Sequence, residues 1–374
     1  MGQLTTDTAN LQNADYEGAD YEEVRAEEEF DHGRLAGYLR GRLPGFDGPL
    51  IVRQFRGGHS NLTYLLRSGG SEWVLRRPPL GPLPPAAHDM NREYRVLSRL
   101  WKAFEPAPRA MLMCDDSSVI GAPFFIMERR RGVVIRKREP IPPALAASPE
   151  SPRRVSEAFI DTLAELHRVD YERIGLGALG RPAGFFARQI KGWMDRWEKA
   201  KTREVPLMNQ LGAWFAGNTP LAQSPALIHN DFFLHNIMIA ADNPGRVVAV
   251  LDWEMSTLGD PMIDLGIALA YWRDRSDPDE LLEMRPEENH TLAAGFMTRG
   301  ELAERYARQS GHDVEMIDFY VAWAYWKTAT VIEQLYARYA RGRTTDERYA
   351  TMGAEPPVLA RAAATILARF GFKG

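Results

Sequence analysis

Three residues in one short stretch of the chain have types and an order that suit phosphoryl transfer. Asp231 ends a His-Asn-Asp triplet, and four residues separate it from Asn236. Two apolar runs then flank the turn sequence of residues 242–245, and the second run ends at Asp252. Such runs around a turn predict a β-hairpin. The hairpin would bring Asn236 close to Asp252.

Phosphoryl transfer needs a carboxylate that orients the attacking hydroxyl and accepts its proton. It also needs oxygen ligands that hold Mg²⁺ on the nucleotide phosphates. Asp231 suits the first role, as the catalytic base, and Asn236 and Asp252 suit the second, as metal ligands.

Two other interpretations use the same stretch. The carboxylates could cap turns, or His229, Asp231 and His235 could form a metal-hydrolase site. We favour phosphoryl transfer because loop, hairpin and Asp252 follow one another in that order, with Asp264 beyond them. In this interpretation His229 is structural and holds the loop.

The order of these residues resembles the protein-kinase catalytic loop and its metal-binding aspartate, with Asn230 in place of the kinase arginine. It is more similar to the aminoglycoside phosphotransferase (APH)/choline kinase-like superfamily, whose usual triplet is His-Gly-Asp. Residues 251–254 and 256–261 resemble the branch associated with acyl-CoA dehydrogenases. The resemblance extends over roughly residues 30–370 and is most specific in residues 228–266.

The resemblance implies an α+β, two-lobed protein-kinase-like fold, with a small antiparallel β lobe and a larger, mostly helical lobe. We expect an acidic, disordered arm in residues 1–28, a nucleotide-binding lobe in 29–127 and a catalytic and substrate-binding lobe in 128–374. The resemblance also implies that Asp264 accepts backbone hydrogen bonds from the catalytic loop. The alternative for Asp264 is an N-cap of the helix expected in residues 265–271.

Composition restricts the class of protein. A length of 374 residues suits two lobes, and a formal net charge of −4 argues against a nucleic-acid binder. The single cysteine, Cys114, excludes a disulfide framework. No apolar run is long enough to cross a membrane, and no signal peptide is evident. We therefore expect a soluble cytoplasmic protein and leave its oligomeric state open.

A glycine-containing turn precedes the strand that we expect to hold the nucleotide phosphates. Through the resemblance it corresponds to the glycine-rich loop of kinases, although a simple hairpin turn is the alternative. Its residues are Gly57, Gly58, Ser60 and Asn61. Arg76, on a strand expected in residues 72–77, aligns with the kinase lysine. Because side chains alternate along a strand, Arg77 should point to the other face, and the assignment could shift by one residue.

Glu93, on a helix expected in residues 88–100, is the candidate partner of Arg76. Local pairing of Glu93 with Arg92 or Arg99 is the alternative. The resemblance further implies that backbone groups near Met127 and Glu128 contact the base of ATP or GTP.

We therefore expect a kinase that transfers a phosphoryl group from ATP or GTP to a hydroxyl of a small molecule, with Mg²⁺. A hydroxyacyl thioester-like metabolite is favoured over an aminoglycoside, because of the branch resemblance and the basic residues in 129–138. The acidic segment 274–283 would instead suit an aminoglycoside, so an aminoglycoside O-phosphotransferase is the first alternative. A catalytically weak, pseudokinase-like nucleotide-binding module is the second. Five aromatic residues could line an apolar cavity or pack in the core: Trp193, Tyr271, Trp272, Trp323 and Trp326.

Overall fold

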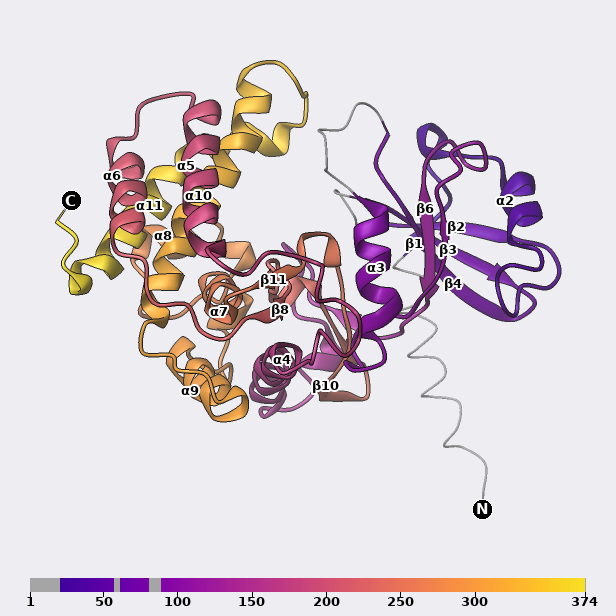
Figure 1. The fold of residues 1–374 in the computed structure, drawn as a ribbon, viewed down its shortest axis with the longest axis horizontal. Coiled ribbons are helices and arrows are strands. Elements are labelled where there is room, and N and C mark those ends of the chain that lie inside the picture. Colours follow the sequence, from indigo (N-terminus) through magenta and orange to yellow (C-terminus); the bar gives the residue numbers. More distant parts are fainter. Residues whose placement is uncertain (1–20, 57–60, 81–88, 374) are drawn as a thin grey trace. The chain divides into compact units, whose positions relative to one another are not determined.

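The computed structural model of the chain describes residues 21–56, 61–80 and 89–373 (Figure 1). The chain separates into two compact units, one up to Arg130 and the other from Arg131 onward. Gly57, Gly58 and Ser60 of the expected phosphate loop lie outside the described residues. None of the helices in the described ranges is long and apolar enough to cross a membrane.

The first unit is built on an antiparallel six-stranded sheet with the strand order β1-β2-β3-β4-β6-β5. Two helices accompany the sheet, α2 (His32–Leu39) and α3 (Met90–Leu100). The strands are β1 (Tyr21–Glu22), β2 (Ile51–Phe55), β3 (Leu62–Ser68), β4 (Ser71–Arg77), β5 (Ala110–Cys114) and β6 (Phe124–Glu128).

Alternation along β4 assigns its side chains to two faces. Trp73 and Leu75 belong to a core cluster that also contains Leu35 and Leu39 of α2. Arg76 points to the other face, toward α3. The helices α2 and α3 accordingly lie on opposite sides of the sheet in Figure 1.

The expectation of a disordered arm in residues 1–28 is wrong for its described end. Tyr21–Glu22 pairs with β2 as an added edge strand. The backbone N of Arg25 donates to Gln54 Oε1 at 3.0 Å, and Arg25 Nε donates to Glu28 Oε2 at 2.8 Å. Glu22, Glu23 and Glu28 pair with arginines, so most of the acidic side chains in residues 21–28 are neutralised, whereas the sequence alone indicated unpaired negative charge. Residues 1–20 lie outside the described part.

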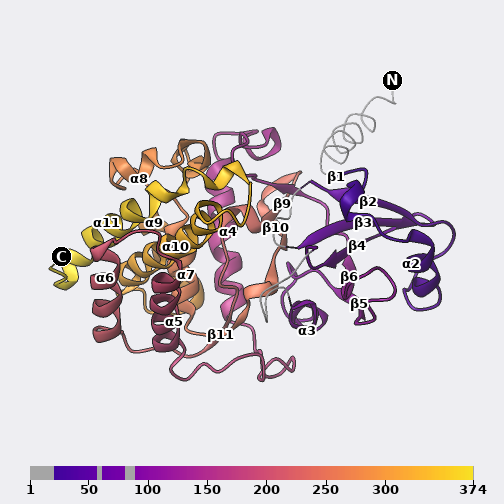
Figure 2. The same cartoon turned by 90° about the horizontal axis from the view of Figure 1, so that it is seen from above.

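The second unit is mostly helical and contains two small sheets (Figure 2). Its helices are α4 (Ser151–His167), α5 (Phe185–Ala200), α6 (Pro206–Gly217), α7 (Pro261–Ala270), α8 (Asp279–Glu283), α9 (Arg299–Ser310), α10 (Ile317–Ala340) and α11 (Glu355–Leu367). One sheet has the order β10-β9-β7 and the other pairs β11 with β8. The strands are β7 (Val133–Val134), β8 (Ala226–Ile228), β9 (Ile237–Ala240), β10 (Asn243–Val250) and β11 (Thr257–Gly259).

Helix α7 is the centre of this unit, since every one of its residues is buried. It packs closely on α10 because Gly266 has no side chain; a Cβ there would lie 2.6 Å from Tyr320 Cβ. Trp272, Trp323 and Trp326 are also buried, and Trp272 Nε1 donates to Met297 O at 2.9 Å. These tryptophans therefore belong to the core, the second of the two possibilities raised by the sequence.

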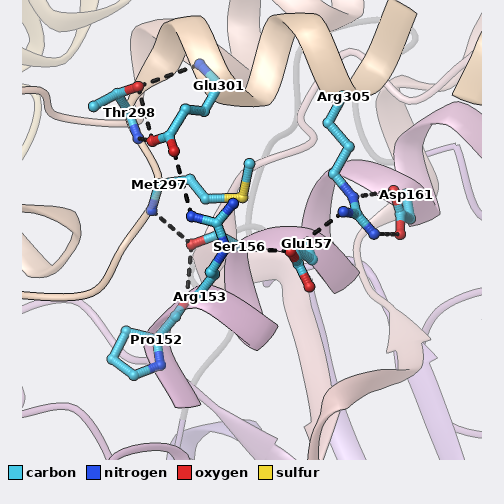
Figure 3. A network of polar contacts seen from close by, with 9 residues as sticks. All are labelled: Pro152, Arg153, Ser156, Glu157, Asp161, Met297, Thr298, Glu301 and Arg305. Carbon is cyan, nitrogen blue, oxygen red and sulfur yellow. Dashed lines mark hydrogen bonds and ion pairs between the residues drawn. The ribbon is translucent and has the colours of Figure 1, made fainter. Parts of the chain in front are cut away.

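A polar network, which we call the α4–α9 cluster, joins those two helices (Figure 3). Arg305 Nε and Nη2 each donate to the Asp161 carboxylate at 2.8 Å. Arg153 bridges Glu157 and Glu301 at 3.4 and 3.3 Å. The cluster consists of these five residues and fixes α9 beside α4.

Candidate active site

The β9–β10 hairpin brings the predicted metal ligands together. Leu251 N donates to Asn236 O at 2.8 Å, so Asn236 lies beside the end of β10, where Asp252 follows. Asn236 Nδ2 donates to Asp231 O at 3.0 Å and lies 3.4 Å from Asp231 Oδ2. The three residues predicted from the sequence are therefore neighbours.

Two residues at the predicted site adopt backbone conformations that are rare outside glycine. Among the described residues, positive φ outside glycine occurs at Arg138, Asn230 and Asp252. Asn230 (φ 64°) precedes Asp231, and Asp252 (φ 69°) ends the hairpin. Such conformations persist where surrounding contacts hold them. Asn230 Nδ2 supplies one such contact by donating to Met255 O at 3.0 Å.

A buried group of side chains, which we call the catalytic-loop cluster, holds the loop that carries His229, Asn230 and Asp231. Asp264 accepts the backbone N–H of His229 at 2.6 Å and that of Asn230 at 2.8 Å. His167 Nε2 lies 3.2 Å from Asp264 Oδ2, and His167 Nδ1 lies 2.7 Å from Tyr306 Oη. Burial would raise the pKa of Asp264, but the hydrogen bond and charge of His167 and the backbone donor hold it below its ordinary value. The cluster comprises His167, His229, Asp264 and Tyr306.

Asp260, rather than Asp264, caps α7. Asp260 Oδ1 accepts from Met262 N at 2.9 Å, and Tyr320 donates to Asp260 Oδ2 at 3.0 Å. Helix α7 begins at Pro261, earlier than the sequence indicated, because proline is well suited to a first helical turn. The alternative role of Asp264 as an N-cap is therefore wrong.

The two histidines of the alternative hydrolase site do not converge with Asp231. His229 Nε2 lies 3.0 Å from Leu251 O, and its ring packs edge-on against Trp253. Burial lowers the pKa of His229. His235 Nδ1 instead lies 2.8 Å from Ile135 O. Within the described ranges no group of three or more His, Cys, Asp or Glu side chains could hold a metal.

Two lysines complete the electrostatic environment of Asp231. Burial raises the pKa of Asp231 to about 7, Lys327 and Lys137 lower it, and Asp252 raises it further. Lys327 Nζ lies 3.4 Å from Asn230 O, and burial lowers the pKa of this lysine. Sequence analysis missed Lys327. Its only signal was its place as the single cation in the first half of α10.

In the first unit, the expected pair of Arg76 and Glu93 is present. Arg76 Nη1 lies 2.9 Å from Glu93 Oε1, and the Glu93 side chain is fully buried. This pairing excludes a purely local role for Glu93. Arg77 faces the other side of the sheet, where its Nη1 donates to Ile120 O at 2.9 Å and its guanidinium stacks over Phe30.

Three other residues of this unit were expected to contact the nucleotide, namely Asn61, Met127 and Glu128. Asn61 and Met127 are buried. Glu128 Oε1 accepts from Arg109 N at 2.7 Å and from Arg130 Nε at 2.9 Å, so its side chain fixes the end of β6.

The sequence was compared with known protein families and with curated proteins. Residues 51–303 match the phosphotransferase enzyme family, APH. The chain belongs to this family. Acyl-CoA dehydrogenase family member 11 of Gallus gallus is 37% identical over 345 residues, which are 87% of this chain and 42% of that protein. The Homo sapiens protein of the same name is 34% identical over 337 residues, 88% of this chain and 42% of that protein. The chain thus spans less than half the length of these curated relatives.

Solved structures of phosphotransferases share the fold. A candidate aminoglycoside phosphotransferase from Ralstonia eutropha is 30% identical, with a TM-score of 0.77 over 91% of this chain and 99% of that one. Aminoglycoside phosphotransferase APH(4)-Ia, solved with ADP and hygromycin B, is 16% identical, with a TM-score of 0.56 over 89% and 98% of the two chains. The chain therefore has the α+β, two-lobed, kinase-like fold of the family.

The oxygen donors at the end of the hairpin suit Mg²⁺. Asn236 uses its Nδ2 toward Asp231, so its amide oxygen is the atom suited to a cation. The Asp252 carboxylate follows directly on the residue that bonds Asn236. Two oxygen ligands are the usual protein share of a Mg²⁺ site, since nucleotide phosphates and water supply the others.

Ion pairs and hydrogen bonds neutralise much of the acidic segment 274–283. Asp274 accepts the backbone N–H of Arg299 at 2.9 Å, and Asp277 pairs with the Arg299 guanidinium. Glu280 pairs with Arg361. Most of these carboxylates therefore fix the start of α9 and the surface of α11, whereas Asp279 and Glu283 are exposed.

Proposed function

We propose that the chain transfers the γ-phosphate of ATP or GTP to a hydroxyl of a small molecule, with Mg²⁺. The observation that carries this proposal is the close set of Asp231, Asn236 and the end of β10 before Asp252, held by the bonds of Asp264 to the loop backbone. Membership of the phosphotransferase family supports it.

Asp231 acts as the base in this proposal. Its carboxylate accepts the hydrogen bond of the acceptor hydroxyl and takes its proton as the oxygen attacks phosphorus. Asn236 Nδ2, 3.4 Å from Asp231 Oδ2, helps to orient the carboxylate. Bound Mg²⁺, held by Asn236 and Asp252, would neutralise phosphate charge. Lys327 adds positive charge beside Asp231, and removing it should weaken binding of anionic groups there.

Residues of the first unit bind the nucleotide in the proposal. Arg76, oriented by Glu93, contacts the phosphates, since a guanidinium can donate two parallel hydrogen bonds to them. Gly57, Gly58, Ser60 and Asn61 cover the phosphates, and the backbone near Met127 and Glu128 contacts the base. The complex of APH(4)-Ia with ADP supports an adenine nucleotide.

The favoured acceptor is a hydroxyacyl thioester-like metabolite. Its support is the similarity to proteins named as acyl-CoA dehydrogenase family members and the two lysines near Asp231. An aminoglycoside is the alternative, supported by the complex of APH(4)-Ia with hygromycin B. The ion pairs of the acidic segment count against it, because a polycation would need carboxylates that are not already neutralised.

A side-by-side phosphorylation assay with hydroxyacyl-CoA and aminoglycoside panels tests the proposal. We expect turnover of hydroxyacyl thioesters, and Asp231→Asn should lower kcat by about 10²–10⁴-fold while nucleotide binding stays unchanged. Efficient turnover confined to aminoglycosides would show that the acceptor is an aminoglycoside and not a hydroxyacyl thioester. Nucleotide binding without turnover of any acceptor would instead support the pseudokinase-like module.

A further inference from the structure

A strongly basic pocket of about 250 Å³ lies at the C-terminal ends of α5 and α10. Five cationic side chains line it, and no carboxylate does. The cations are Arg196, Lys199, Arg338, Arg341 and Arg343. All of them belong to the second unit, the one that contains Asp231.

One of these cations has a structural role that shapes the pocket. Arg341 Nη2 donates to Ala200 O at 3.0 Å, and Nη1 donates to Lys199 O at 3.3 Å. A cation at a helix C-terminus satisfies exposed carbonyls and interacts well with the helix dipole. Arg341 thereby fixes the end of α5 to the end of α10 and makes the wall of the pocket rigid.

Helix ends account for only two of the other four cations: Lys199 and Arg338 lie in the last turns of α5 and α10, whereas Arg196 and Arg343 do not. In the described part of the chain, Arg196, Lys199, Arg338 and Arg343 form no ion pair with a carboxylate. The α5 residue Glu198 is engaged by Lys201 at 2.9 Å. Clustered like charges repel one another, and an anion in the pocket would offset this repulsion.

A row of side chains connects the pocket with the catalytic loop. Helices α5 and α10 pack side by side (Figures 1 and 2). Lys327 Nζ lies 5.7 Å from the ring of Trp193, and the Arg196 guanidinium lies 4.4 Å from the same ring. Along α10, Lys327, Gln334 and Arg338 recur at spacings of seven and four residues and therefore share a face.

We propose that this pocket binds a phosphate-bearing end of the acceptor whose hydroxyl reacts at Asp231; the inference rests on the proposed function. Guanidinium groups bind phosphate by paired hydrogen bonds, which favours an acceptor that carries a phosphate over an uncharged one. At about 1.5 Å per residue, Lys327 and Arg338 are roughly 16 Å apart along α10. The acceptor is therefore elongated, such as a hydroxyacyl thioester of a phosphorylated carrier.

Matched substrates test the proposal. One is a hydroxyacyl-CoA, and the other is its pantetheine thioester, which has the same acyl chain and no phosphate. Arg338→Ala/Arg343→Ala should raise KM for the CoA thioester roughly 10- to 100-fold, as expected for lost charge-assisted hydrogen bonds, and leave KM for the pantetheine thioester and both kcat values unchanged. Arg173→Ala/Arg308→Ala removes two exposed cations elsewhere and should change none of these values. Equal KM changes for both thioesters, or none, would overturn the proposal.

A binding measurement separates failure of this inference from failure of the proposed function. Adenosine 3′,5′-bisphosphate is titrated by calorimetry, with the nucleotide site filled by a non-hydrolysable ATP analogue. The native chain should bind it and the double variant should bind it at least about 10-fold more weakly, even if no thioester is turned over. Absence of binding to the native chain would overturn the proposal that the pocket binds phosphate. Binding of pyrophosphate there without any effect on thioester KM would show an anion site unrelated to the acceptor, and would overturn the proposal too.

Discussion

The catalytic-loop cluster and the α4–α9 cluster use the same chemistry in different surroundings. In each, an aspartate accepts hydrogen bonds from a segment distant in sequence: Asp264 from the loop at His229, and Asp161 from Arg305 of α9. The Asp264 and His167 side chains have 0% exposure. Those of Arg305 and Asp161 have 26% and 37% exposure.

This difference in exposure decides what each cluster contributes. Water can replace a lost partner at an exposed ion pair, so such a pair adds little to stability. A buried donor whose acceptor is removed has no such replacement and keeps its full desolvation cost. The buried cluster can therefore impose an unusual loop conformation, including the positive φ of Asn230, and the partly exposed α4–α9 cluster can only align two helices.

The largest effect should follow loss of the buried carboxylate. We expect Asp264→Ala to lower the free energy of unfolding by about 3–5 kcal/mol, because two loop N–H groups and His167 lose their acceptor. Urea unfolding followed by fluorescence measures the change. Since the pKa of Asp264 is lowered in the folded state, its contribution is present above the ordinary value of 3.8 and is lost as the pH falls further.

Asp264→Asn is the conservative companion of this change. It keeps an acceptor for one loop N–H and loses the negative charge. Its free energy of unfolding should therefore lie between that of the native chain and that of Asp264→Ala. A change below about 1 kcal/mol for Asp264→Ala, the range of exposed pairs, would contradict the contrast between the clusters.

A second prediction concerns the end of the hairpin that the buried cluster supports. Asp252→Ala should weaken binding of Mg²⁺–nucleotide by more than about 10-fold, because a ligand is lost. Binding of metal-free nucleotide should change little. Titrations with and without Mg²⁺ compare the two, and equal losses in both would show that Asp252 is only structural.

A third prediction extends the contrast to neighbouring residues of β4. Arg76→Ala should raise the nucleotide KM roughly 10-fold, the size of a lost charge-assisted hydrogen bond, and Arg76→Lys should restore part of it. Arg77→Ala should lower stability through the lost bond to Ile120 O, with little change in KM. The opposite ranking in KM would assign the phosphate contact to Arg77.

Local sequence signals were sufficient to predict the β9–β10 hairpin and the strand that carries Arg76. The apolar runs on either side of the expected turn predicted β9 and β10, although the turn itself lies at residues 241–242 and β10 already begins at Asn243. These features depend on neighbours in sequence, which is why their positions could be predicted. The pair of Arg76 and Glu93 was proposed through the resemblance, because no local rule chose between Glu93's possible partners.

Features that depend on packing between distant segments could not be predicted. Lys327 gave no indication of the loop it faces until α10 lay beside residues 229–231. The acidic segment looked available for a cation, since its partners Arg299 and Arg361 come later in the chain. Residues 21–28 looked solvated because Gln54, which bonds Arg25, belongs to the next strand.

The smallest effect is expected in the partly exposed α4–α9 cluster. Asp161→Ala makes the same carboxylate-to-methyl change as Asp264→Ala, but it should lower the free energy of unfolding by only about 0.2–1 kcal/mol. Arg305 keeps a second acceptor, Glu157, 3.3 Å from its Nη1, and water reaches the vacated position. Phosphoryl transfer should stay unchanged, because the hydrogen bonds that hold His229 and Asn230 run to Asp264 and Leu251 and do not involve Asp161. Urea unfolding of both alanine variants under identical conditions compares the two clusters directly. Similar losses in the two variants would mean that fork-like pairing of Arg305, rather than burial, sets the strength of these contacts.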